Sequence, residues 1–166
     1  MSGGGLGCNS GYARVARPGL LICRSASMIG LPSAYLTAID MDEQPKKTML
    51  VIDDDEAIRV WLSRMAESIG AVVAGLAENG EVGVEKFKEL RPDLVMLDIN
   101  MPVMGGREAL SYILHEDPEA KVVILTSSSS MAMVSELFDI GAHHYLRKDL
   151  PPSEVKSTLK KILEEI

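Results

Sequence analysis

Five polar side chains of this sequence follow the ends of apolar segments, and together they have the composition of a site for phosphoryl chemistry. They are Asp53, Asp54, Asp98, Thr126 and Lys148. The segments that precede them are residues 49–52, 94–97, 122–125 and 144–146. Carboxylates bind a divalent cation such as Mg²⁺, and an ammonium group neutralises phosphoryl oxygens. Burying such charged and polar groups in a core is unfavourable, but together they can hold a metal ion beside a phosphoryl group.

These groups can meet only if the segments before them are parallel strands of one sheet. Apolar runs with little alternation are typical of strands that are covered on both faces. Parallel strands also bring all their carboxyl ends to one edge of the sheet. The strands are expected at residues 48–52, 71–76, 93–97, 121–125 and 143–146. The five side chains would then lie in one pocket.

The segments between the strands show the spacing of amphipathic helices. Apolar residues recur there at intervals of three and four, which is one helical face. Asp55 is expected to cap the first helix, and Gly70 to end it. The five helices are expected within residues 55–70, 84–90, 105–117, 134–141 and 151–166. This alternation predicts an α/β fold, a doubly wound parallel sheet of five strands with five helices.

Composition favours one folded domain at residues 47–166, preceded by an extension. The 166 residues suffice for one domain with a substantial core. Residues 1–46 are rich in glycine and show no sustained periodicity, so we expect a disordered or non-native N-terminal extension. An organelle transit peptide is the alternative, because three arginines and several serines precede the first acid, Asp40.

Charge and cysteine content exclude several classes of function for the predicted domain. Residues 41–166 carry 14 basic and 23 acidic side chains, a net charge of −9, which argues against direct binding of nucleic acid. Both cysteines, Cys8 and Cys23, lie in the extension, so the domain has no disulfide and suits a reducing cytoplasm. No segment has the roughly 18 consecutive apolar residues of a membrane span.

The three acids after the first strand have different expected roles. Neighbouring carboxylates such as Asp53 and Asp54 repel each other at a strand end unless a cation joins them. With Asp98 they offer hard oxygen ligands suited to Mg²⁺. Asp55 is better explained as a helix cap, because acids are favoured in the first turn by the helix dipole.

Four motifs together resemble the receiver domain of two-component response regulators, over residues 47–166. They are Val51-Ile52-Asp53-Asp54, Leu97-Asp98-Ile99-Asn100-Met101-Pro102 followed by Gly105-Gly106, Leu125-Thr126-Ser127, and Tyr145-Leu146-Arg147-Lys148. Each motif alone is weak, but their order and positions at strand ends make the resemblance specific. It implies a flavodoxin-like fold and, in particular, a stand-alone regulator of the chemotaxis type. One departure is Asp149, which replaces the proline that usually follows the lysine.

The resemblance implies that Asp98 is the phosphoacceptor, with Thr126 and Lys148 contacting the phosphoryl group. Mg²⁺ would be held by Asp54, by Asp98 and by the backbone carbonyl of Asn100. Asp53 would act on the metal through water. Apart from phosphorylating and slowly dephosphorylating itself, such a domain is not an enzyme.

The resemblance also implies partners and a switch. The phosphoryl group would come from a sensor histidine kinase or a histidine phosphotransfer protein. Tyr145 matches the family's switch aromatic, which moves inward with Thr126; a half-buried strand tyrosine is the alternative. The response would be read by a downstream protein on the face of the fourth helix, fifth strand and fifth helix.

Two other functions compete with a phosphorylated receiver. A phosphatase with an aspartate nucleophile would use Asp53 and Asp55 at the end of the first strand, although Ala57 stands where Thr or Val is expected. A docking module with a receiver fold would need no phosphate, but the complete set of acids, hydroxyl and lysine disfavours it. A nucleotide site is excluded, since acids occupy the place of a glycine-rich phosphate loop.

Overall fold

The computed structural model describes residues 46–127 and 130–166, and five strands alternate there with five helices. The expectation of a disordered or non-native extension concerns residues that, apart from Lys46, lie outside this part of the chain. The strands are β1 (Thr48–Ile52), β2 (Val72–Ala77), β3 (Leu94–Asp98), β4 (Val122–Thr126) and β5 (His144–Arg147). The helices are α1 (Glu56–Ser68), α2 (Gly80–Leu90), α3 (Gly106–Glu116), α4 (Met131–Ile140) and α5 (Pro152–Glu165).

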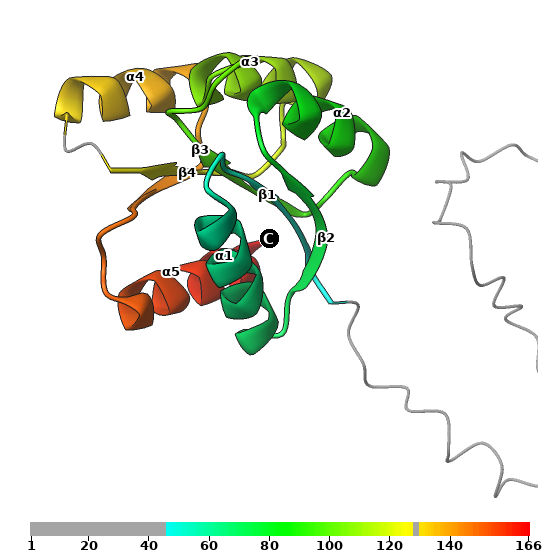
Figure 1. Cartoon of the computed structure of the whole chain (residues 1–166), viewed down its shortest axis with the longest axis vertical. Helices are drawn as coiled ribbons and strands as arrows, with labels where there is room; N and C mark the ends of the chain where they lie inside the picture. The colour runs from blue at the N-terminus through cyan, green and yellow to red at the C-terminus, as the bar shows by residue number, and fades with distance from the viewer. Residues whose placement is uncertain (1–45, 128–129) are drawn as a thin grey trace, which may run out of the picture. The chain divides into compact units, whose positions relative to one another are not determined.

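The strands form one parallel sheet in the order β2-β1-β3-β4-β5, which confirms the predicted fold. Helices α1 and α5 cover one face of the sheet, and α2, α3 and α4 cover the other (Figure 1). The strand order reverses beside β1, so the carboxyl ends of β1 and β3 flank the position where ligands of such sheets bind. Asp53 and Asp98 come from these two strand ends.

Two apolar cores hold the sheet between the helices. On the side of α1 and α5, strand residues pack against Leu62, Leu159 and their neighbours. On the other side, strand residues pack against Phe87, Leu110 and Ile113. Strands β3 and β4 are buried along their whole length, as their unbroken apolar runs predict. The polar side chains at their ends are thus positioned by strands with little freedom to move.

Four strands, β2 to β5, end one residue later than expected, and for β3 and β4 the added residues are Asp98 and Thr126. Asp98 pairs in register with Leu125, and Thr126 pairs with Arg147. Both polar residues therefore belong to the sheet itself. This places them more firmly than a position in the following loops would.

Local capping determines where α1 and α2 begin and end. The Asp55 side chain accepts a hydrogen bond from the Ala57 amide at 2.8 Å, which confirms the expected cap of α1. Gly70 follows α1 with φ of 84°, the left-handed conformation in which glycine is favoured. Helix α2 begins at Gly80, earlier than predicted, because the Asn79 side chain accepts a hydrogen bond from the Val82 amide.

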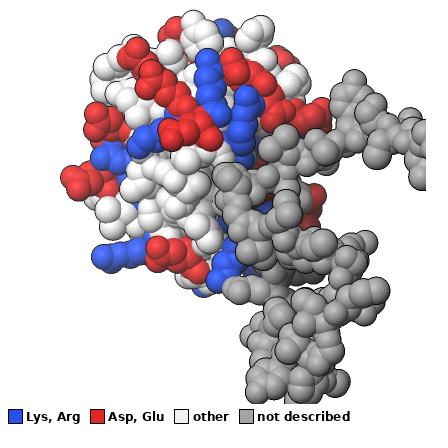
Figure 2. Space-filling view, turned by 90° about the vertical axis from the view of Figure 1, so that its right-hand side faces the viewer, with Lys and Arg blue, Asp and Glu red and all other residues white. Residues whose placement is uncertain are grey.

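On the face of the described residues seen in Figure 2, Lys and Arg side chains are interspersed with Asp and Glu around an uncharged area. Among the residues described, no helix is long and apolar enough to cross a membrane.

Candidate functional site

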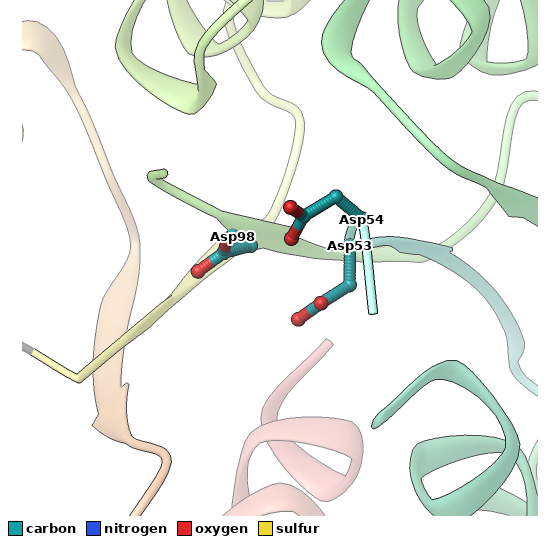
Figure 3. Close-up of side chains that lie close together, drawn as sticks. All are labelled: Asp53, Asp54 and Asp98. Atoms are coloured by element: carbon teal, nitrogen blue, oxygen red, sulfur yellow. The ribbon is translucent and has the colours of Figure 1, made fainter. Parts of the chain in front are cut away.

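Three carboxylates gather at the carboxyl ends of β1 and β3 (Figure 3). Each of Asp53, Asp54 and Asp98 offers one oxygen, and these oxygens lie within 4.8 Å of one another. Asp53 is fully buried and Asp98 is 2% exposed, whereas Asp54 is exposed. The cluster therefore has two buried oxygen donors and one that faces solvent.

Lys148 reaches the two buried carboxylates from the loop after β5. Its ammonium nitrogen lies 2.7 Å from Asp53 Oδ2 and 3.1 Å from Asp98 Oδ1. The backbone amide of Lys148 donates to the Thr126 carbonyl at 2.9 Å, which ties the start of this loop to the end of β4. The Lys148 ammonium thus joins Asp53 and Asp98, which lie 95 and 50 positions earlier in the sequence.

Burial and the three charges shift the proton equilibria of this cluster. Burial raises the pKa of Asp98, and repulsion from Asp53 adds to the rise, while Lys148 opposes it. Burial acts to lower the pKa of Lys148, but its contacts with Asp53 and Asp98 outweigh this effect and raise the pKa. The ammonium therefore stays charged, while the charge on Asp98 is only partly compensated.

The donor set fits a small divalent cation. Asp53 Oδ2 and Asp98 Oδ1 are buried, and among the described residues neither accepts a hydrogen bond of good geometry; both form an ion pair with Lys148. Asp53 Oδ1 accepts a hydrogen bond from the Asp55 amide at 3.0 Å, which fixes that carboxylate in place. Buried anionic oxygens with unused lone pairs, beside an exposed third carboxylate, are suited to Mg²⁺, which takes few protein ligands and keeps several waters.

Thr126 ends β4 with no exposed surface, and Tyr145 lies in the neighbouring strand β5. The Tyr145 ring is partly buried against the core on the side of α4. It meets the Phe138 ring of α4 edge to face, with centroids 6.4 Å apart and planes at 88°. Tyr145 thus joins α4 to β5 two residues before Arg147, the strand position that pairs with Thr126.

The loop between β3 and α3 begins at Ile99 and contains Asn100, whose side chain is exposed. The loop closes where the Gly106 amide donates to the Ile99 carbonyl at 3.0 Å. A Cβ atom on Gly106 would lie 1.9 Å from the Asp98 carbonyl oxygen, so no other residue fits there without moving the backbone. The second glycine of the Gly105-Gly106 pair therefore allows α3 to begin directly against Asp98.

Three further side chains make contacts at or beside the site that were not predicted from the sequence. Arg59 in α1 donates from Nη1 to the Asp53 carbonyl at 2.6 Å and so ties the acidic loop to the helix. A basic residue in the first turn of a helix interacts unfavourably with the helix dipole. The position of Arg59 there was the feature of the sequence that could have indicated a compensating contact. Arg147 and Asp149, on either side of Lys148, form an exposed bidentate ion pair. Asp149 thus makes a contact that the proline usual in the family could not make.

Known proteins are similar to this chain in sequence and in fold. The sequence model of the response regulator receiver domain matches residues 49–160. Chemotaxis protein CheY of Thermotoga maritima is 40% identical over 116 residues, which cover 70% of this chain and 97% of that protein. Response regulator GacA of Pseudomonas aeruginosa is 33% identical over 115 residues, which cover 69% of this chain and 54% of that protein.

Solved structures of receiver proteins have the same fold as this chain. A chain in the crystal structure of the CheX-CheY-BeF3-Mg+2 complex from Borrelia burgdorferi superposes with a TM-score of 0.67 at 28% identity, covering 70% of this chain and 88% of that chain. Chemotaxis protein CheY4 of Vibrio cholerae superposes with a TM-score of 0.66 at 27% identity, covering 71% and 99%. The family match, the relatives and the acid-lysine site agree, and this chain belongs to the response regulator receiver domain family.

Proposed function

We propose that the chain acts in a phosphorelay by accepting a phosphoryl group on Asp98 from a phosphohistidine of a partner protein. A carboxylate oxygen of Asp98 forms a bond to phosphorus, the phosphorus–nitrogen bond breaks, and the histidine leaves as the neutral ring after taking up a proton. The product is an acyl phosphate. The observation that carries this proposal is the contact of the Lys148 ammonium with both Asp53 and Asp98.

The side chains around Asp98 have the charges that this transfer requires. Phosphoryl transfer needs positioning and neutralisation of charge more than covalent chemistry from the protein. Lys148 supplies a fixed positive charge to a phosphoryl oxygen once it leaves its ion pair with Asp98. The Thr126 hydroxyl donates a hydrogen bond to another oxygen. The buried strand ends that carry Asp98 and Thr126 keep these groups in position.

We further propose that the acidic cluster binds Mg²⁺. Asp54, Asp98 and the backbone carbonyl of Asn100 would hold the ion, with Asp53 acting through water. When bound, Mg²⁺ supplies the charge that offsets the negative phosphoryl oxygens. Two findings support this assignment: the buried oxygens that accept no hydrogen bond, and the beryllium fluoride and magnesium in the Borrelia burgdorferi complex.

Phosphorylation would be read through α4, β5 and α5. The hydrogen bond from Thr126 to the phosphoryl group favours one of two packings of these elements. Tyr145 is the proposed link, since it contacts Phe138 of α4 and lies one strand from Thr126. The partners would be a histidine kinase or histidine phosphotransfer protein and a downstream protein. We place the protein in the cytoplasm, because residues 41–166 contain no cysteine.

Incubation with acetyl phosphate and Mg²⁺ tests the assignment. Intact-mass spectrometry should detect one phosphoryl adduct in the wild type and none in Asp98→Asn. A small donor suffices if the domain phosphorylates itself, and slow loss of the adduct in buffer would reveal its autodephosphorylation. The phosphatase alternative predicts instead continuous release of phosphate that survives Asp98→Asn and is lost in Asp53→Asn. The phosphatase alternative needs Asp55 as its second catalytic acid. The Asp55 side chain instead caps α1 by accepting a hydrogen bond from the Ala57 amide, which supports the receiver.

A further inference from the structure

Val103 combines two unusual properties in the loop between β3 and α3. Its side chain is 79% exposed, more than any other large apolar side chain of the described residues. Its backbone has φ of 69°, a region that residues branched at Cβ rarely adopt. A single exposed valine needs no special explanation. An exposed valine in a strained backbone conformation does, because glycine or asparagine would fit that position with less strain.

The surrounding loop imposes this conformation. The Met104 amide donates to the Pro102 carbonyl at 2.9 Å, which closes a three-residue turn around Val103. A turn of this kind with positive φ is rare and strained. The Met104 carbonyl in turn accepts a hydrogen bond from the Gly80 amide at 3.1 Å, so the loop is tied to the start of α2. Strain of this kind persists where surrounding contacts determine it, and it concentrates at functional positions.

The turn lies close to the proposed phosphoacceptor. Gly106 packs directly on the Asp98 backbone, and Val103 precedes Gly106 by three residues. Three residues span at most about 11 Å, which is also about the diameter of one helix with its side chains. A protein that brings a phosphohistidine to bonding distance of Asp98 therefore comes within about this distance of the turn.

We propose that Val103 is an apolar contact for the phosphohistidine-bearing protein that phosphorylates Asp98. This inference rests on the proposed function. The strained turn presents a branched apolar side chain at the edge of the acidic pocket, and the donor buries it as the reacting atoms meet. Acetyl phosphate is too small to make the same contact. Val103 should therefore affect transfer from a protein donor and leave transfer from the small donor unchanged.

Two variants of Val103 and one matched control test the proposal. Val103→Gly removes both the side chain and the backbone strain, and Val103→Thr keeps the shape and replaces a methyl by a hydroxyl. The control is Val72→Thr, at an exposed valine that pairs with Thr48 at the opposite, amino end of the sheet. The protein donor is the autophosphorylated histidine kinase that transfers fastest to the wild-type chain in a panel of purified kinases. Each variant is also assayed with acetyl phosphate, and its melting temperature is measured.

Val103→Gly should lower kcat/KM for transfer from the kinase about tenfold, as expected for the loss of a buried apolar side chain. Val103→Thr should lower it about threefold, and Val72→Thr should match the wild type. Rates with acetyl phosphate should stay within about twofold, and Val103→Gly should melt about 2–5 °C higher as strain is released. Wild-type transfer from the kinase, an equal loss with acetyl phosphate, or no rise in melting temperature would each overturn the proposal. Absence of any Asp98 adduct in the wild type would instead overturn the proposed function.

Discussion

Replacing Asp98 by Asn should stabilise the fold at neutral pH even though it removes the proposed phosphoacceptor. Burial, aided by repulsion from Asp53 and opposed by Lys148, raises the pKa of Asp98. The folded state therefore binds a proton at Asp98 more tightly than the unfolded state does. The stabilisation from this proton is complete below the usual aspartate pKa of 3.8 and is lost as the pH rises through the raised value.

The magnitude follows from the charges that face Asp98. At an effective dielectric constant of about 20, attraction to Lys148 at 3.1 Å is worth about 5 kcal/mol. Repulsion from Asp53, with oxygens within 4.8 Å, is at least about 3 kcal/mol, and solvent-screened Asp54 adds about 1 kcal/mol. These terms nearly cancel, so the cost of removing the carboxylate from water remains. The neutral amide avoids that cost, and we expect a gain of about 2 kcal/mol, or about 8 °C in melting temperature.

Urea unfolding without Mg²⁺ measures this gain, followed by the fluorescence of Trp61, the only tryptophan of the chain. The matched control is Asp54→Asn, an exposed site where the gain should not exceed the repulsion of about 1 kcal/mol that Asp54 exerts on Asp98. The advantage of Asp98→Asn should shrink as the pH falls toward the usual aspartate pKa. A variant less stable than the wild type at neutral pH, or a gain that does not depend on pH, would refute this reasoning.

Three other substitutions separate packing, metal binding and switching. Gly106→Ala should lower the free energy of unfolding in urea by about 3 kcal/mol or more, because its Cβ would meet the Asp98 carbonyl at 1.9 Å; Gly105→Ala, with its nearest atom at 3.5 Å, should change it little, and equal effects would contradict the packing argument. Asp54→Asn should raise the Mg²⁺ concentration needed for half of the rise in melting temperature at least about tenfold, and an unchanged titration would exclude Asp54 as a ligand. Thr126→Val should still take up phosphate from acetyl phosphate but lose the phosphorylation-dependent change in hydrogen exchange of α4 and β5; Thr126→Ser should keep it, and a Val variant that switches normally would remove this residue from the pathway.

The order of the elements could be predicted from the sequence, because buried parallel strands appear in it as continuous runs of apolar residues. The acids at the ends of residues 49–52 and 94–97 then had to share an edge of the sheet. The start of α2 was harder to predict. Gly80 and Gly83 weaken the helical pattern, yet a Cβ on Gly83 would lie 2.5 Å from the Ile52 side chain, so packing requires a residue with low helix propensity.

Features that depend on tertiary contacts could not be predicted from the sequence. Nothing in the residue type of Val103 indicates a positive φ, because the conformation is imposed by hydrogen bonds of its neighbours. The contact of Arg59 with the Asp53 carbonyl depends on where α1 lies relative to β1. The ion pair of Arg147 with Asp149 depends on the conformation of the turn that follows β5.

Chemical mapping of the phosphorylated residue tests the central claim most directly. The chain is incubated with acetyl phosphate and Mg²⁺ and then treated with borohydride, which reduces an acyl phosphate to an alcohol and so converts a phosphorylated aspartate into homoserine. Peptide mass spectrometry should find homoserine at position 98 alone and none after Lys148→Met, which removes the cation that contacts Asp98. Homoserine at position 53 or 54, or none at position 98 of the wild type, would contradict the account.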